Sequence, residues 1–165
     1  MIHINTDNFE EMLSDQKVYQ TLVDNNVNLV SGLATNYLNH YIEILLLIEM
    51  LPDMHECFAD ILAWKPMSYC EHADCSKLPN SEIVLKVYNA VDKSRRQKLA
   101  DLAHEANLAL TNYINRAGTA LDLNDTDLLR EIAAEAKEYL TPAIERMTGV
   151  ITPSAKTTMP FVNNF

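Results

Sequence analysis

Two long stretches in the second half of the chain carry apolar residues at the spacing of one helix face, and this periodicity most limits the folds open to the chain. The spacing i, i+3, i+4, i+7 predicts α-helices that bury one side. The first stretch contains Leu99, Leu102, Ala103, Ala106, Leu110, Tyr113, Ile114 and Ala117. The second contains Leu128, Leu129, Ile132, Ala133, Ala136, Tyr139, Leu140, Ala143, Ile144 and Met147. We expect four of these residues to be deeply buried on facing helices: Leu102, Leu110, Ile132 and Leu140.

The second of these helices has clear end signals and one interruption. Asp125 or Thr126 suits its N-cap, because either side chain can accept a hydrogen bond from an unpaired backbone N–H group. Gly149 follows the last apolar position and marks the C-terminal end. Pro142 lies inside the pattern, and because proline lacks a backbone N–H donor we expect a kink or a break near Tyr139.

The first half of the chain is also patterned for helices. Residues 7–24 carry an amphipathic stripe that predicts the first helix. Residues 27–51 follow as a helix that is apolar almost all round near its C-terminal end, which is typical of a helix enclosed by others. Pro52 ends this helix and suits the start of a short helix over about 53–64.

The segment between the two halves carries weaker signals. Residues 65–80 have no apolar period and predict an irregular loop. Residues 81–116 could form one helix or two. We favour one, because a new helix beginning at Ser94 would crowd Arg95 and Arg96 at its positive dipole end.

These assignments predict an all-α fold, a helical bundle of about five helices with one irregular Cys/His-containing loop. The bundle is expected to be a single domain over residues 1–148, since a chain of 165 residues can bury one core but is short for two. Residues 149–165 predict an extended C-terminal tail that packs along the bundle or stays loose.

The charge balance limits the partners. The chain has 23 acids and 13 bases, so its formal net charge is −10. Nucleic acids and anionic membranes bind cationic surfaces, and we therefore expect no direct contact with either. The apolar residues 27–51 include too many polar side chains for a bilayer span, and the N-terminus has no secretory signal pattern. We expect a cytoplasmic protein.

The most specific local pattern is a group of cysteines and histidines. Cys57, Cys70, His72 and Cys75 would supply a complete Cys3His set for one structural zinc ion, the one cofactor the sequence suggests. His55 lies two residues from Cys57, so on a helix only one of them can face the ion. The spacing fits no zinc finger with paired Cys-x-x-Cys motifs. The competing interpretation is that reduced cysteines occur here without a ligand role.

Sequence motifs for catalysis are weak. Asp101-x-x-His104 is the only forward match to the Glu-x-x-His pattern of di-iron bundles, and it has Asp in place of Glu. The acids between Asp122 and Asp127 resemble the start of a calcium loop, but Asp127 occupies the position that requires glycine. The sequence contains no glycine-rich phosphate loop and no Gly-x-Ser-x-Gly nucleophile elbow. We therefore expect no enzymatic activity.

The uneven placement of charge bears most on function. Residues 1–64 contain ten acids and one base, so they carry −9 of the net −10. On the predicted helices these acids include two stripes at helical spacing. One stripe is Asp7, Glu11 and Asp15, and the other is Asp53, Glu56 and Asp60. The competing interpretation is that acids near helix N-termini complement the helix dipole and keep the surface solvated.

Two functions remain open. The first is a non-catalytic module that binds a protein partner with a basic surface through the two acidic stripes, as a regulator, adaptor or inhibitor. If the stripes are adjacent, their charge density approaches that of a DNA strand, and the chain would mimic DNA toward a nucleic-acid-binding protein. The basic residues within 93–98 either meet an acidic stripe of another helix or subunit, which leaves a homo-oligomer open, or form a solvated turn. The alternative is a small zinc-binding helical protein.

Overall fold

The computed structural model describes residues 9–77 and 79–153, and this part of the chain is all-α, as predicted. Its only strand-like feature is an isolated antiparallel bridge between Val27 and Ala34. The helices are, in chain order, α1 (Phe9–Leu13), α2 (Gln16–Asp24), α3 (Asn36–Met50), the 3-10 helix η1 (His55–Cys57), α4 (Phe58–Ala63), α5 (Tyr69–Cys75), α6 (Ser81–Ala90), α7 (Lys93–Asp122) and α8 (Thr126–Ile151). About five helices is therefore too low a number for these residues, because several predicted segments are divided or contain a further short helix.

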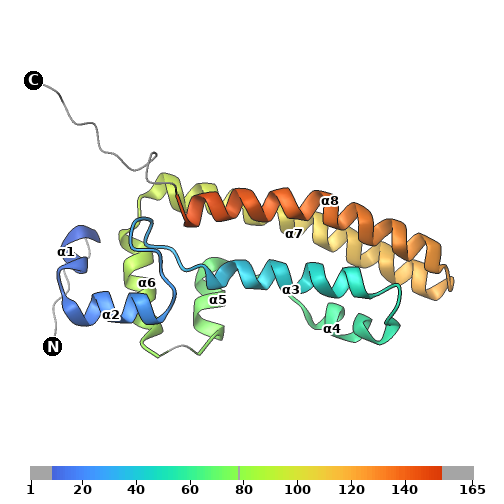
Figure 1. The fold of residues 1–165 in the computed structure, drawn as a ribbon, viewed down its shortest axis with the longest axis horizontal. Helices are drawn as coiled ribbons and strands as arrows, with labels where there is room; N and C mark the ends of the chain where they lie inside the picture. Colours follow the sequence, from blue (N-terminus) through green and yellow to red (C-terminus); the bar gives the residue numbers. More distant parts are fainter. Residues whose placement is uncertain (1–8, 78, 154–165) are drawn as a thin grey trace, which may run out of the picture.

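Three long helices, α3, α7 and α8, run along the molecule and enclose its core (Figure 1). α7 and α8 form an antiparallel pair joined by a short turn, and α3 packs along α8. α1, α2 and α6 gather at one end of the long axis, whereas α4 lies at the other end (Figure 1). None of the described helices is long and apolar enough to cross a membrane.

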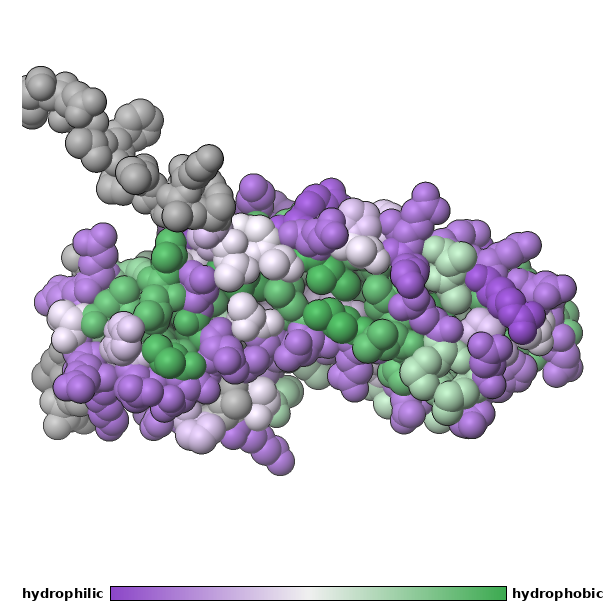
Figure 2. Space-filling model, viewed as in Figure 1, coloured by the Kyte–Doolittle hydropathy of each residue, from purple (hydrophilic) through white to green (hydrophobic). Residues whose placement is uncertain are grey.

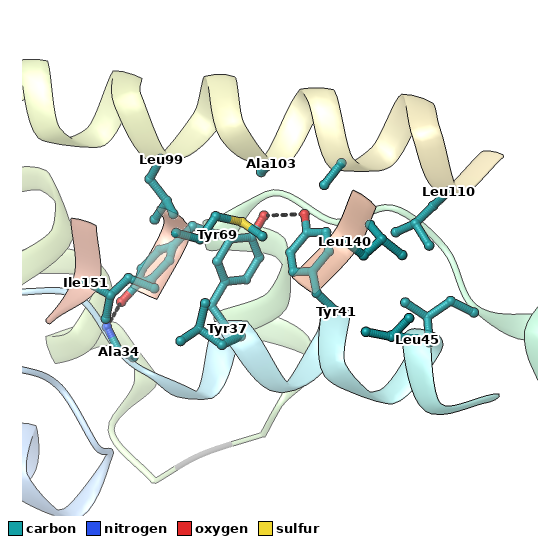
Figure 3. Packing of buried hydrophobic residues seen from close by; sticks show 14 of the residues in the cluster. Ala34, Tyr37, Tyr41, Leu45, Tyr69, Leu99, Ala103, Leu110, Leu140 and Ile151 are labelled. Atoms are coloured by element: carbon teal, nitrogen blue, oxygen red, sulfur yellow. Dashed lines mark hydrogen bonds between the residues drawn. The ribbon is translucent and has the colours of Figure 1, made fainter. Parts of the chain in front are cut away.

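The core contains most of the residues that the periodicity placed there. Three of the four residues predicted to be deeply buried are so: Leu110, Ile132 and Leu140. Leu102 is only half-buried. Figure 3 shows Tyr37 and Tyr41 pointing from α3 toward α7, with their hydroxyls 3.1 Å apart. The Tyr37 hydroxyl also donates to the Met67 carbonyl at 2.8 Å, so the tyrosines bring satisfied polar groups into the core.

The predicted helix over residues 7–24 is divided into α1 and α2 within its described part. The two helices meet at a turn that contains Asp15. The Asp15 carboxylate accepts hydrogen bonds from the backbone N–H groups of Lys17 (2.8 Å) and Val18 (3.2 Å), so it caps α2. The cap lets the chain turn here at little cost, although the apolar stripe continues across the turn.

The beginning of the predicted helix over residues 27–51 is a loop, and α3 starts only after it. Gly32 lies in this loop with a positive φ of 73°. A side chain at this position would also collide with α6–α7, because an added Cβ would lie 2.7 Å from the Val91 Cγ2 atom. Ser31 Oγ donates to the Ile151 carbonyl at 2.5 Å, which ties the loop to the end of α8.

The segment 65–80, predicted as an irregular loop, contains the helix α5. Ser68 and Glu71 form a capping box at its start. The Ser68 hydroxyl accepts from the Glu71 N–H at 3.2 Å, and the Glu71 carboxylate accepts from the Ser68 N–H at 2.7 Å. These two bonds satisfy backbone donors at the helix start, so a short segment without an apolar period still forms a helix.

Residues 81–116 do not form the single helix predicted, because α6 ends before α7 begins. The chain is extended at Val91, and the Asp92 carboxylate accepts a hydrogen bond from the Arg95 N–H at 3.1 Å. The negative charge of Asp92 therefore lies at the N-terminus of α7. It offsets the positive charges of Arg95 and Arg96, which had made a helix start here look unfavourable.

α8 is continuous through Pro142, so the predicted break is absent from this helix. Both Pro142 and Glu138 are exposed, and water can therefore reach the Glu138 carbonyl that loses its usual donor at position 142. α8 also continues past Gly149 to Ile151, whose side chain is fully buried. Residues 154–165 of the predicted tail lie outside the described residues.

Candidate functional site

The first predicted acidic stripe, Asp7, Glu11 and Asp15, does not lie along one helix. Asp7 is outside the described residues. Glu11 is exposed on α1, whereas Asp15 is half-buried at the start of α2. The Asp15 carboxylate already accepts hydrogen bonds from two backbone N–H groups, so its main role is that of a helix cap.

The second predicted stripe, Asp53, Glu56 and Asp60, is exposed but divided among a turn, η1 and α4. Asp53 Oδ1 lies 3.6 Å from a guanidinium nitrogen of Arg130 on α8. α1 and α4 lie at opposite ends of the molecule (Figure 1), so the two stripes are not neighbours. A charge density like that of a DNA strand would require them to be adjacent.

The four predicted zinc ligands are not brought together. Cys57 is buried in η1, whereas Cys70, His72 and Cys75 belong to α5. Cys70 and Cys75 are five residues apart on one helix, so their side chains point to different sides. In the part of the chain that the structure describes, no three His, Cys, Asp or Glu residues are grouped as a metal site requires.

α3 exposes an apolar face that the sequence prediction did not identify. Ile42, Leu46 and Met50 recur at i, i+4, i+8, and 40%, 53% and 42% of their respective surfaces are exposed. We call these three residues the α3 face. Figure 2 shows apolar side chains along the middle of the visible surface, over α3, with polar side chains around them. Single exposed apolar residues are common, but three in line on one helix form a patch that another molecule can cover.

The two sides of the α3 face differ in charge. On the side toward α8, the Glu49 carboxylate pairs with Lys137 at 2.7 Å. On the side toward α4, Glu43 and Asp60 line a groove of about 350 Å³, and neither forms an ion pair within the described residues. Lys65 also lines this groove, so two carboxylates face one ammonium. We call Glu43 and Asp60 the acidic margin.

Trp64 fixes the acidic margin relative to the α3 face. Its ring stacks on the His40 imidazole, with 4.7 Å between the centroids and 22° between the planes. The indole Nε1 donates a hydrogen bond to the His40 backbone carbonyl at 3.0 Å. Because Trp64 is the C-cap residue of α4 and His40 belongs to α3, these contacts hold the two helices in register.

Two histidines share an aromatic cluster with this tryptophan. The rings of His40 and His72 lie 5.8 Å apart, and His72 also meets the edge of Tyr37. Burial lowers the pKa of both histidines, and the charge of His72 lowers the pKa of His40 further. His40 Nε2 is buried and has no hydrogen-bond partner among the described residues. Protonation of His40 at Nε2 would therefore create a buried N–H donor that no acceptor meets.

The α3 face escaped prediction because its residues look like core residues in the sequence. A signal was nevertheless available. At 100° per residue, Tyr41, Ile44 and Ile48 point in similar directions and define one buried side of the helix. The α3 face falls outside that side, so an apolar residue there has no place in the same core.

Comparisons with protein-family models, with curated proteins and with solved structures each found no match. Function is therefore inferred from the surface itself. The α3 face combines exposed apolar side chains, a one-sided acidic margin and a tryptophan that holds the two supporting helices together. Such a surface is suited to binding a partner segment.

Proposed function

We propose that this chain is a non-catalytic binding protein that docks an amphipathic segment of a protein partner on the α3 face, with basic residues of that segment at the acidic margin. The observation that carries the proposal is the exposure of Ile42, Leu46 and Met50 in one line. Five of the eleven large exposed hydrophobic residues in the described chain lie within residues 42–62, so the apolar surface is concentrated around α3 and α4.

Exposed apolar area favours association. Covering it releases about 25 cal/mol for each Å² removed from water. A helix laid along α3 would present residues at i, i+3, i+4 and i+7, which match the i, i+4, i+8 spacing of the α3 face. An amphipathic helix is therefore the occupant to which the spacing corresponds.

Charge complementarity sets the expected orientation of the partner. Glu49 and Asp53 are already paired with Lys137 and Arg130 on the α8 side. The carboxylates of the acidic margin have no such partners among the described residues, and they lie on the α4 side. Lys and Arg side chains of the partner are thus expected toward α4. Complementary charges of this kind raise the association rate and lose their effect with increasing salt.

The proposed function is still that of an acidic protein-binding module, as the sequence suggested. The binding surface is now the α3 face with the acidic margin and no longer the two acidic stripes. Glu11 belongs to α1 and Asp15 caps α2, and these helices lie at the end of the molecule opposite α4 (Figure 1), so neither residue is part of this surface. Of the predicted contact residues, Asp60 belongs to the acidic margin, and Asp53 is engaged with Arg130.

A model peptide of defined chemistry tests the proposal. An amphipathic helical peptide of leucine and lysine is titrated into the full chain, with a leucine–glutamate peptide as its charge-reversed control. Backbone amide shifts should concentrate on α3 and α4 with the lysine peptide and weaken at high salt. Leu46→Ser should weaken binding, whereas Leu108→Ser, an exposed leucine on α7, should not.

A second pair of variants tests the orientation. Glu43→Gln should slow association more than Glu49→Gln, although both change the net charge by one. Equal binding by the two serine variants, or shifts confined to the other end of the molecule, would refute the proposal. Concentration-dependent dimerisation that Leu46→Ser abolishes would instead assign the α3 face to a second copy of the chain.

A further inference from the structure

A second cavity, of about 200 Å³, lies where α6 and the first half of α7 meet the start of α5. Its walls include Tyr88 of α6 and Arg96, Ala100, Ala103 and Asn107 of α7. We call it the α7 cavity. It contains no residue of the α3 face or of the acidic margin, so what binds there is a separate question from the proposed function.

The α7 residues of this cavity lie along one side of the helix. Steps of four and seven residues return a side chain to the same face, which aligns Arg96, Ala100, Ala103 and Asn107. At 1.5 Å per residue, the α-carbons of Arg96 and Asn107 are roughly 16 Å apart along the axis. The two alanines lie between these polar ends, and their small side chains leave room for a flat body.

The Arg96 guanidinium lies beside the Tyr88 ring at one end of the cavity. Its Cζ atom lies 5.6 Å from the centroid of the Tyr88 ring. Tyr88 in turn stacks on Tyr69, with 4.6 Å between centroids and 14° between planes. The Tyr69 hydroxyl accepts a hydrogen bond from the Ala34 N–H at 2.7 Å. These contacts support the ring against which the cation lies and favour its position at the cavity.

Arg96 and Asn107 both have unused hydrogen-bonding capacity. Within the described residues Arg96 has no carboxylate partner, although the whole chain has a net charge of −10. Its Nε is buried without a hydrogen-bond acceptor, and Asn107 Oδ1 is buried without a donor. Unpaired buried polar groups are costly, so a ligand that supplies an anion at one end and a donor at the other would relieve both costs.

We propose that the α7 cavity binds a small aromatic carboxylate, with its carboxylate on the Arg96 guanidinium, its ring over Ala100 and Ala103, and a hydroxyl donor toward Asn107. Guanidinium and carboxylate form charge-assisted, often bidentate hydrogen bonds. Pockets for drug-sized ligands occupy about 300–1,000 Å³, so a cavity of about 200 Å³ limits the ligand to a body near one ring in size.

Titration of the full chain with 4-hydroxyphenylacetate tests this inference, with 4-hydroxyphenylacetamide as the uncharged control of nearly the same shape. The acid should bind at least about tenfold more tightly than the amide, the ratio expected for one charge-assisted hydrogen-bonded pair. Amide shifts should map to α6 and the first half of α7. Phenylacetate, which lacks the hydroxyl, should bind more weakly than the hydroxylated acid.

The chain offers a matched control one residue away. Arg96→Gln should bring the acid-to-amide ratio close to one, whereas Arg95→Gln should leave it unchanged, because Arg95 does not line the cavity. Ala100→Phe should abolish binding of both probes by filling the space, and Ala100 is exposed, so this variant is expected to fold. Equal affinities of acid and amide for the unaltered chain, or equal effects of the two arginine variants, would overturn the proposal.

Discussion

The α7–α8 pair and the two short helices α4 and α5 are held in place in different ways. α7 and α8, of 30 and 26 residues, bury a long row of apolar side chains against each other and against α3. α4 and α5 have only six and seven residues. They depend on the capping box of Ser68, the stacking of Trp64 on His40 and hydrogen bonds to backbone carbonyls. Isolated helices shorter than about 12 residues are marginal in water, so α4 and α5 are ordered by these contacts together with the burial of a few side chains such as Ile61 and Tyr69.

The comparison implies that the molecule opens unevenly. Collective burial makes α7 and α8 the most resistant part, whereas loss of one specific contact can release a short helix. The α3 face itself lies on a core helix, whereas Asp60 of the acidic margin lies on α4, in the more easily released part. Breaking one kind of contact at a time should therefore show which region of the molecule responds.

The largest effect is expected from the long pair. Leu140→Ala removes a fully buried side chain of α8 and should lower the free energy of unfolding by about 2–5 kcal/mol. Urea unfolding measures this change. Leu108→Ala, on an exposed leucine of α7, should change the free energy by less than about 0.5 kcal/mol. Similar losses of free energy of unfolding in the two variants would mean that the burial of Leu140 does not stabilise the fold more than the exposed Leu108 does.

A smaller and more local effect is expected at Trp64. Trp64→Ala removes the stack on His40 and the hydrogen bond to its carbonyl, together worth about 1–3 kcal/mol. Hydrogen exchange should accelerate in α4 while α7 and α8 stay protected. Trp64→Phe retains an aromatic ring without the N–H donor. Its rate of hydrogen exchange in α4 should lie between those of the unaltered chain and of Trp64→Ala. Uniform acceleration throughout the chain would show that the segment does not open on its own.

The helix start at Asp92 should contribute less. Asp92→Ala removes the carboxylate that accepts from the Arg95 N–H and leaves the positive charges of α7 uncompensated at its N-terminus. The expected loss is about 1 kcal/mol, measured by urea unfolding. Asp101→Ala removes an exposed acid from the interior of α7 and provides the control. An equal loss in both variants would show that the effect is not specific to the helix start and would argue against capping.

The smallest effect near neutral pH concerns the two histidines of the aromatic cluster. Burial lowers the pKa of His40 and of His72 below the ordinary value of 6.5, so the unfolded chain binds more protons as pH falls below that value. Their contribution to stability is therefore fully present above about pH 6.5 and is lost as pH falls toward the folded-state pKa values. Unfolding measured between pH 7 and 5 should become easier toward pH 5. His40→Gln should flatten this dependence, whereas His55→Gln, at an exposed position of η1, should not.

The contrast between the two regions also explains what the sequence could predict. Helical periodicity depends on burial of one side of a long helix, and it correctly placed Leu110, Ile132 and Leu140 in the core. Side-chain chemistry predicted an N-cap at Asp125 or Thr126, and the Asp125 carboxylate does accept a hydrogen bond from the Leu128 N–H at 2.9 Å. Other capping residues were also visible in the sequence, but the prediction gave them less weight than the apolar periodicity.

The helix boundaries that the prediction missed, at the start of α5 and between α6 and α7, are both marked by such capping residues. Ser68-x-x-Glu71 is the sequence signature of a capping box, yet the segment was predicted to be a loop because it lacks an apolar period. Asp92 likewise precedes Arg95 by the spacing of an N-cap contact. The candidate sites were less accessible to prediction. His40 and Trp64 are 24 residues apart in the sequence and meet only after folding. Tyr69 and Tyr88 are also distant in the sequence and stack only in the folded chain.

The bond between Ser31 and Ile151 has a consequence for the order in which the chain reaches its final form. It joins residues 120 positions apart, so the loop before α3 cannot be locked until the end of α8 has left the ribosome. Gly32 adds to this delay, because its close approach to Val91 requires the α6–α7 joint to be in place as well. During synthesis, the apolar sides of α3 therefore stay exposed until most of the chain has emerged. The newly made segment needs protection from aggregation over that interval.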